Sequence, residues 1–128
     1  SPEVIVNGEY DTSADIWSLG CMVFELVTGD YLFDPKKGKT YKKNDDHLAL
    51  ICELIGECPN TDFLLHGDDS QDYFDRKGKL KHIKSLKFWP LYHVLIEKYK
   101  LREAEAKGLS DFLLKMIVWE PSKRATAQ

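Results

Sequence analysis

The segment from Thr12 to Gly29, TSADIWSLGCMVFELVTG, constrains the fold more than any other part of the chain. Thr12 is expected to cap the N-terminus of a helix, with Asp15 completing a capping box three residues later. Gly29 supplies a left-handed stop at the other end. Apolar residues surround nearly the whole helix: Ile16, Trp17, Leu19, Met22, Val23, Phe24, Leu26 and Val27. Such a helix is expected to be central and buried on most sides.

A second helix is expected in DDHLALICELIG, capped by Asn44 or Asp45 and stopped by Gly56. Its apolar face consists of Leu48, Ile51, Cys52 and Ile55. Asp46 and Glu53 lie seven residues apart, so they are expected two turns apart on another face. The helix therefore pairs a core face with an acidic one.

The remaining segments predict further helices and one long loop. Pro90 fits the first position of a helix that runs to about Lys100. Ser110 is expected to cap a helix over DFLLKMIVW, and Thr126 is a candidate cap for one more. Residues 60–85 have the composition of a long polar connection, and no stretch alternates convincingly as a strand. The fold class is therefore expected to be all-α, with five or six helices.

The net charge of −3 conceals a strong asymmetry along the chain. Residues 1–43 carry seven acids and five bases, residues 44–75 nine acids and no base, and residues 76–128 five acids and thirteen bases. The acidic window would attract cations or basic peptides, although a solvated acidic surface has the same composition. The basic run RKGKLKHIKSLKFW lacks a stacking platform or recognition-helix pattern, which leaves nucleic-acid binding a minor alternative.

Several other classes of site find little support. No apolar run reaches the roughly 18 residues of a membrane span. Three cysteines without framework spacing predict free thiols in a reducing compartment. The aspartates of residues 68–75 lack the glycine and terminal glutamate of a calcium loop, so no metal is expected. The four histidines form no catalytic pattern and are treated as structural: His47, His66, His82 and His93.

Three motifs then occur in a recognisable order: SPE at the start, DIWSLG after it and PSKRAT near the end. Their order and spacing resemble the C-terminal lobe of eukaryotic protein kinases, where an A-P-E triplet ends the activation segment. The resemblance covers residues 1–128 and implies part of a kinase domain of the α+β kinase fold, with insert-like loops at 30–45 and 57–89. The chain is accordingly expected to be a fragment of a longer protein.

A narrower resemblance rests on GDYLFDP, DDHLALICELIG and the long segment from Asp75 to Lys100. These stretches look like the SR-protein kinases, which phosphorylate serines in Arg-Ser repeats of splicing factors. The LAMMER-type kinases are the second choice, because they share the HLA helix pattern but lack GDYLF. The resemblance implies ATP and magnesium in the parent protein, Arg-Ser-rich partners, no membrane, and a cytoplasmic and nuclear location.

The Gly-rich loop, the H-R-D aspartate and the D-F-G aspartate of kinases are all missing from this sequence. No catalytic, ATP-binding or metal-binding residue is therefore assigned in this sequence. The phosphoryl transfer is expected to be carried out by an active parent kinase. A pseudokinase or scaffold that only binds partners remains the alternative from another class.

The resemblance implies supporting roles for several residues. Glu3 and Arg124 would form a buried ion pair that ties the activation segment to the last helices. Asp15 would accept hydrogen bonds from the catalytic loop of the parent. Three apolar residues of the same helix would support the catalytic core: Trp17, Met22 and Leu26.

The resemblance to SR-protein kinases also implies a docking groove for basic peptides. Asp30, Asp46 and Glu53 would line it, and Trp89 and Lys98 would border it. Two carboxylates two helical turns apart are separated by about 11 Å, which arginines three or four residues apart in an extended peptide can span. Without the resemblance, the same acids are simply a solvated helix face.

Overall fold

The computed structural model describes residues 1–128, except for the side chain of His66. The chain is helical, and the described residues form no strand beyond two isolated bridges, Gly8 with Gly67 and Phe74 with Leu80. Seven α-helices and a 3₁₀ turn follow in order: α1 (Pro2–Ile5), α2 (Ser13–Thr28), α3 (Lys43–Ile55), α4 (Thr61–His66), α5 (Ser70–Tyr73), α6 (Leu91–Glu97), α7 (Glu103–Leu113) and η1 (Pro121–Lys123). None of these helices has the length and apolar character to span a membrane.

The long helix α2 ends where expected but begins differently. Gly29 adopts a left-handed φ of 79°, and its N–H donates to the Glu25 carbonyl. The Thr12 side chain makes no cap hydrogen bond, so the expected capping box is absent. Asp11 takes over this role, because its carboxylate accepts from the Ser13 N–H at 2.8 Å and the Ser13 hydroxyl at 2.5 Å. A local Asx turn has replaced the side-chain cap.

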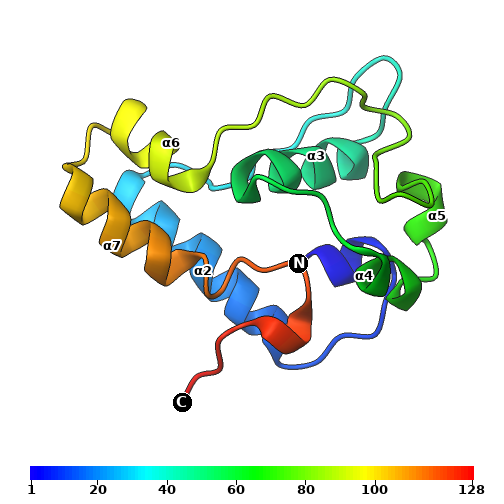
Figure 1. Ribbon diagram of the computed structural model, residues 1–128, viewed down its shortest axis with the longest axis horizontal. Helices are drawn as coiled ribbons and strands as arrows, with labels where there is room; N and C mark the ends of the chain where they lie inside the picture. Colours follow the sequence, from blue (N-terminus) through cyan, green and yellow to red (C-terminus); the bar gives the residue numbers. More distant parts are fainter.

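Helix α3 contributes more buried residues than any other helix in the described part of the chain, and Figure 1 shows it near the centre of the molecule. Its buried residues include Leu48, Ile51 and Cys52, as expected, while Ile55 is half-buried. The N-cap residue is Lys42 and not Asn44 or Asp45, both of which lie inside the first turn; Asp45 accepts the Lys42 N–H at 2.9 Å. Gly56 ends the helix with φ 93°. By contrast, α2 buries only Trp17, Gly20 and Phe24, so the expectation that it is covered on most sides is wrong for this chain.

The other helices differ from expectation in their bounds. Ser110 does not cap a helix: it lies buried inside α7, where its hydroxyl donates to the Lys107 carbonyl. Residues 60–85 are not simply a loop, because α4 and α5 fall within them. Pro90 stands just before α6, which ends at Glu97, short of Lys100. Thr126 lies beyond the last described helix and caps none.

Helices α2 and α7 run side by side (Figure 1), and the glycine of DIWSLG, Gly20, lets the segment just after α7 approach α2 closely. A Cβ on Gly20 would lie 2.9 Å from Ile117 Cδ1 and 3.1 Å from Met116 Cβ. The isoleucine tip could shift, but the Met116 Cβ is fixed to the backbone. A side chain at this position would therefore force the segment after α7 away from α2.

We expect Gly20→Ala to lower the free energy of unfolding by about 1–3 kcal/mol, the usual cost of overpacking a core. Urea denaturation of the protein measures this change. The matched control is Gly108→Ala, because a Cβ on Gly108 meets nothing within 4 Å inside α7. That substitution should stabilise the protein by about 0.5–1 kcal/mol, since alanine favours the helix. Equal effects of the two substitutions would contradict the packing argument.

Candidate functional site

Glu3 and Arg124 form the expected contact, although they stand 121 positions apart in the chain. Arg124 Nη1 donates to Glu3 Oε2 at 2.6 Å, and Nη2 donates to Oε1 at 2.7 Å. Both side chains are almost fully buried. The planar guanidinium thus meets the carboxylate with two parallel bonds, a geometry that lysine cannot reproduce.

Arg124 also donates to three backbone carbonyls, which leaves none of its nitrogens without a partner. Nε bonds to Val118 at 2.9 Å, Nη1 to Ser13 at 3.2 Å and Nη2 to Trp119 at 3.4 Å. Its guanidinium lies 5.0 Å from the centre of the Trp17 ring. One side chain therefore joins α1, the start of α2 and the segment between α7 and η1.

The pair changes the ionisation of Glu3. Burial by itself would raise the pKa of this carboxyl, because desolvation disfavours the charged form. The hydrogen bonds and charge of Arg124 act in the opposite direction and hold the pKa of Glu3 below its usual value. The folded protein therefore favours the charged carboxylate form of Glu3.

The remaining support residues lie on α2 and do not share one environment. Trp17 is buried and stacks against Phe33, with ring centres 5.9 Å apart. Asp15, Met22 and Leu26 are exposed; Leu26 retains 78% of its accessible surface. Two of the apolar residues that led to the prediction of a helix buried on most sides, Met22 and Leu26, therefore lie on an exposed face of α2.

A cavity of about 230 Å³ collects three of the predicted docking residues: Glu53, Trp89 and Lys98. They come from α3, from the segment before α6 and from its C-terminal end. Aromatic and apolar residues supply much of the remaining wall: Phe24, Tyr31, Leu32, Phe33, Leu54 and Tyr99. We call this hollow the α3–α6 groove.

Asp30 lies at the edge of the α3–α6 groove, because its carboxylate accepts the Tyr99 hydroxyl at 2.8 Å. Burial raises the pKa of the Tyr99 phenol, and the hydrogen bond to Asp30 raises it further. Asp46 does not line the groove, because it lies two turns before Glu53 on α3. The structure thus brings Glu53, Trp89 and Lys98 together, places Asp30 beside them, and leaves Asp46 further along the helix.

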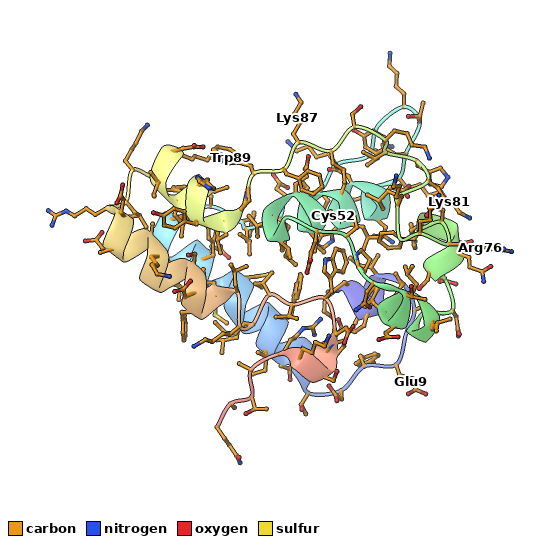
Figure 2. The ribbon with its side chains drawn as sticks, viewed as in Figure 1. Glu9, Cys52, Arg76, Lys81, Lys87 and Trp89 are labelled. Atoms are coloured by element: carbon orange, nitrogen blue, oxygen red, sulfur yellow. The ribbon has the colours of Figure 1, made fainter. Side chains whose placement is uncertain are left out.

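Two of the predicted docking acids also accept hydrogen bonds from the backbone of loop segments. The spacing of the acids in the sequence did not predict these contacts. Asp46 Oδ2 accepts the Lys36 N–H at 2.8 Å, and Glu53 Oε2 accepts the Lys87 N–H at 2.6 Å. The Trp89 indole N–H donates to Glu97 at 2.5 Å. Figure 2 shows Lys87 and Trp89 on the segment that passes over α3 toward α6. These contacts position the segments that flank the acidic face.

The described histidines have structural surroundings. Burial lowers the pKa of His47 to about 4, and its ring lies against Phe33. His82 Nδ1 lies 3.0 Å from the buried Asp45 carboxylate, while His93 packs against Tyr92. The side chain of His66 lies outside the described residues. Among the side chains that are described, no three acids, histidines or cysteines gather as metal ligands.

Comparison with known proteins identifies the class of the chain. The protein kinase domain model matches residues 1–128, and the chain belongs to this family. Across its length it is also similar to SR-protein kinases. It is 54% identical over 128 residues to the serine/threonine-protein kinase SRPK of Physarum polycephalum, 50% over 127 residues to SKY1 of Saccharomyces cerevisiae, and 50% over 125 residues to SRSF protein kinase 3 of Homo sapiens.

These matches include 98–99% of this chain but only 30%, 17% and 22% of the respective relatives. The chain therefore spans less than a third of the length of the curated relatives it matches. All three are serine/threonine or SRSF protein kinases by name, so the chain is similar to one part of such enzymes.

Proposed function

We propose that the chain is the C-terminal-lobe part of a serine/threonine protein kinase that acts on Arg-Ser-rich proteins. The observation that carries this proposal is the similarity of about 50% or more to SR-protein kinases along nearly the whole chain. The parent would transfer the ATP γ-phosphoryl group to serine hydroxyls. This part would supply substrate docking and a rigid helical base.

The residues of this chain do not fit a site for ATP or magnesium. The glycine-rich loop, the strand lysine and the metal-binding aspartate of kinases are absent from its sequence. No acidic cluster among the described side chains could replace them. Nucleotide and metal binding therefore belong to other parts of the proposed parent.

The exposed face of α2 suits the supporting role. Met22 and Leu26 lie about two and three turns beyond Asp15 along this helix, and all three are open to solvent. In the proposed parent, the catalytic loop would cover this face, with its backbone N–H groups donating to Asp15. The apolar residues would then pack against the catalytic core.

The α3–α6 groove suits a basic peptide. Glu53 lines it and Asp30 stands at its edge, while each has a second carboxylate oxygen besides the one that holds Lys87 or Tyr99. Trp89 is 41% exposed and offers an aromatic surface on which a guanidinium can stack. Asp46, two turns along α3, extends the acidic track. Arginines spaced along an extended chain could meet these groups in turn.

We expect the double substitution Asp46→Asn and Glu53→Gln to weaken binding of an Arg-Ser peptide. The amide side chains keep an oxygen for the Lys36 and Lys87 N–H groups while they remove the charge. Each exposed ion pair contributes about 0.2–1 kcal/mol, so the Kd should rise by about 2- to 30-fold. Fluorescence anisotropy of a labelled peptide on the full-length protein at low ionic strength measures this.

The matched control carries Glu105→Gln and Asp111→Asn, which remove the same charge from the exposed surface of α7. Its peptide affinity should stay close to that of the unaltered protein. Added salt should narrow the difference between the docking variant and the control, because salt screens exposed charges. Equal affinities of both variants at low salt would reject the docking groove. Tighter binding of random-sequence RNA than of the peptide would favour the nucleic-acid alternative.

A further inference from the structure

Two cysteines at the C-terminal end of α3 lie unusually close together. Cys52 is in the last turns of the helix, and Cys58 follows in the connection to α4. The Cys58 thiol donates to Cys52 Sγ, with the two sulfur atoms 3.0 Å apart. A disulfide bond needs about 2.05 Å, so an approach of only about 1 Å would join them.

The two thiols differ in their access to solvent. Cys52 is fully buried, and burial raises the pKa of its thiol well above the usual value. Cys58 is half-buried and lines an open cavity of about 330 Å³ between the end of α3 and the segment after α7. Trp119 and Leu114 form part of the opposite wall. A small oxidant can therefore reach Cys58 more readily than Cys52.

The backbone between the cysteines forms the left-handed C-terminal cap of α3. Gly56 has a φ of 93°, and its N–H donates to the Cys52 carbonyl at 2.8 Å. The Trp119 indole N–H donates to the Glu57 carbonyl at 3.0 Å and holds the segment that leads from this cap to Cys58. Both thiols are thus held in place from either side, which gives their reaction a high effective concentration.

We propose that Cys52 and Cys58 form a reversible redox modification site, with Cys58 as the reactive thiol and Cys52 as the resolving thiol. The oxidant is hydrogen peroxide. Cys58 sulfur attacks the peroxide oxygen, the O–O bond breaks, and Cys58 sulfenic acid and water result. Cys52 sulfur then attacks the Cys58 sulfur and displaces the hydroxyl group as a second water, which takes up the Cys52 proton. Two thiols are oxidised to one disulfide, and one peroxide is reduced.

The link would tie the last turns of α3, next to Glu53, to the connection that precedes α4. Figure 2 places Cys52 in α3, under the segment that carries Lys87 and Trp89. The third cysteine, Cys21, has no comparable partner among the contacts of the described residues, and burial raises the pKa of its thiol to about 11. Cys21 therefore serves as an internal reference for non-selective oxidation.

The test treats the full-length protein with increasing hydrogen peroxide and then traps free thiols with N-ethylmaleimide under denaturing conditions. Trypsin and a glutamate-specific protease cut after Glu53, Glu57 and Arg76, which places Cys52 and Cys58 on separate peptides. We expect mass spectrometry to find these peptides joined, with the loss of two hydrogen atoms, at doses that leave Cys21 alkylated. Dithiothreitol should restore both thiols.

Single substitutions assign the order of the two steps. In Cys52→Ala, Cys58 should still react, and dimedone should trap its sulfenic acid. In Cys58→Ser, which alters the half-buried position, Cys52 should remain alkylated by maleimide at the same dose. The inference is overturned if Cys21 is oxidised as readily as Cys58, if Cys52 oxidises equally in Cys58→Ser, or if no joined peptide forms. None of these outcomes depends on kinase activity or on peptide docking.

Discussion

Replacing Arg124 with alanine should lower the free energy of unfolding by about 3–5 kcal/mol, the cost of leaving a buried carboxylate without its partner. The Glu3 side chain is 3% exposed and would lose both hydrogen bonds of the guanidinium. The carbonyls of Ser13, Val118 and Trp119 would lose a donor as well. Urea denaturation followed by circular dichroism measures the loss.

Two further variants distinguish the loss of the Glu3–Arg124 ion pair from the general effect of removing a positive charge. Arg124→Lys keeps the charge but cannot make two parallel bonds, so most of the loss should persist. Lys123→Ala removes the neighbouring cation, which forms an exposed ion pair with Glu120 at 3.3 Å. That loss should stay within about 0.5 kcal/mol. A similar stability of Arg124→Ala and Lys123→Ala would show that the buried pair contributes little.

The same pair makes stability depend on pH in one direction. The pKa of Glu3 is lower in the folded protein than its ordinary value, so unfolding takes up a proton at acidic pH. The stabilisation is fully present above the unfolded pKa of about 4.3 and falls as the pH drops through the folded pKa. Arg124→Ala should remove this contribution, which a comparison of unfolding curves at pH 7 and pH 3 would reveal.

Trp17→Ala should also lower the free energy of unfolding by about 3–5 kcal/mol, as expected for a buried aromatic side chain. Only 2% of Trp17 is exposed, and its ring contacts both the Arg124 guanidinium and the Phe33 ring. Its removal leaves a cavity at the joint between α2, η1 and the segment after α2. Thermal and urea unfolding measure the loss.

The conservative variant Trp17→Phe keeps an aromatic face toward Arg124 and should recover more than half of that loss. Tyr10→Ala is the matched control for removing an aromatic side chain, because Tyr10 is 70% exposed. Its effect should stay within about 0.5 kcal/mol. If Trp17→Ala is no more destabilising than Tyr10→Ala, Trp17 is not a packing residue of this joint.

Signals that act within a few residues predicted the C-terminal ends of α2 and α3 correctly. Gly29 and Gly56 stop α2 and α3 because only glycine adopts their left-handed backbone without a steric cost. The residues expected to cap the N-terminal ends of helices were predicted less accurately. Thr12 and Ser110 have the right chemistry for caps, but Asp11 caps α2 instead, and Ser110 lies in the interior of α7. A polar side chain near a helix start has several possible partners, and only the folded backbone selects among them.

The spacing of Asp46 and Glu53 predicted their places on α3, since the helical repeat fixes the angle between them. It could not show that Lys36 and Lys87 donate backbone N–H groups to these acids, because loops cross the helix from distant parts of the chain. The proximity of Trp89 and Lys98 to Glu53 has the same origin. The chemistry of the groove was thus predictable residue by residue, whereas its shape was not.

By itself, the sequence determined the helical character of the chain, the glycine stops and the motifs that place it among protein kinases. Only the tertiary structure decided which apolar faces are buried. Helix α2 was predicted to be buried on most sides, yet Leu26 is exposed and α3 contributes more buried residues than α2. Local conformation depends on neighbouring residues, whereas burial depends on which distant segments pack against a face. Gly20 against Met116 and Glu3 against Arg124 are such long-range contacts.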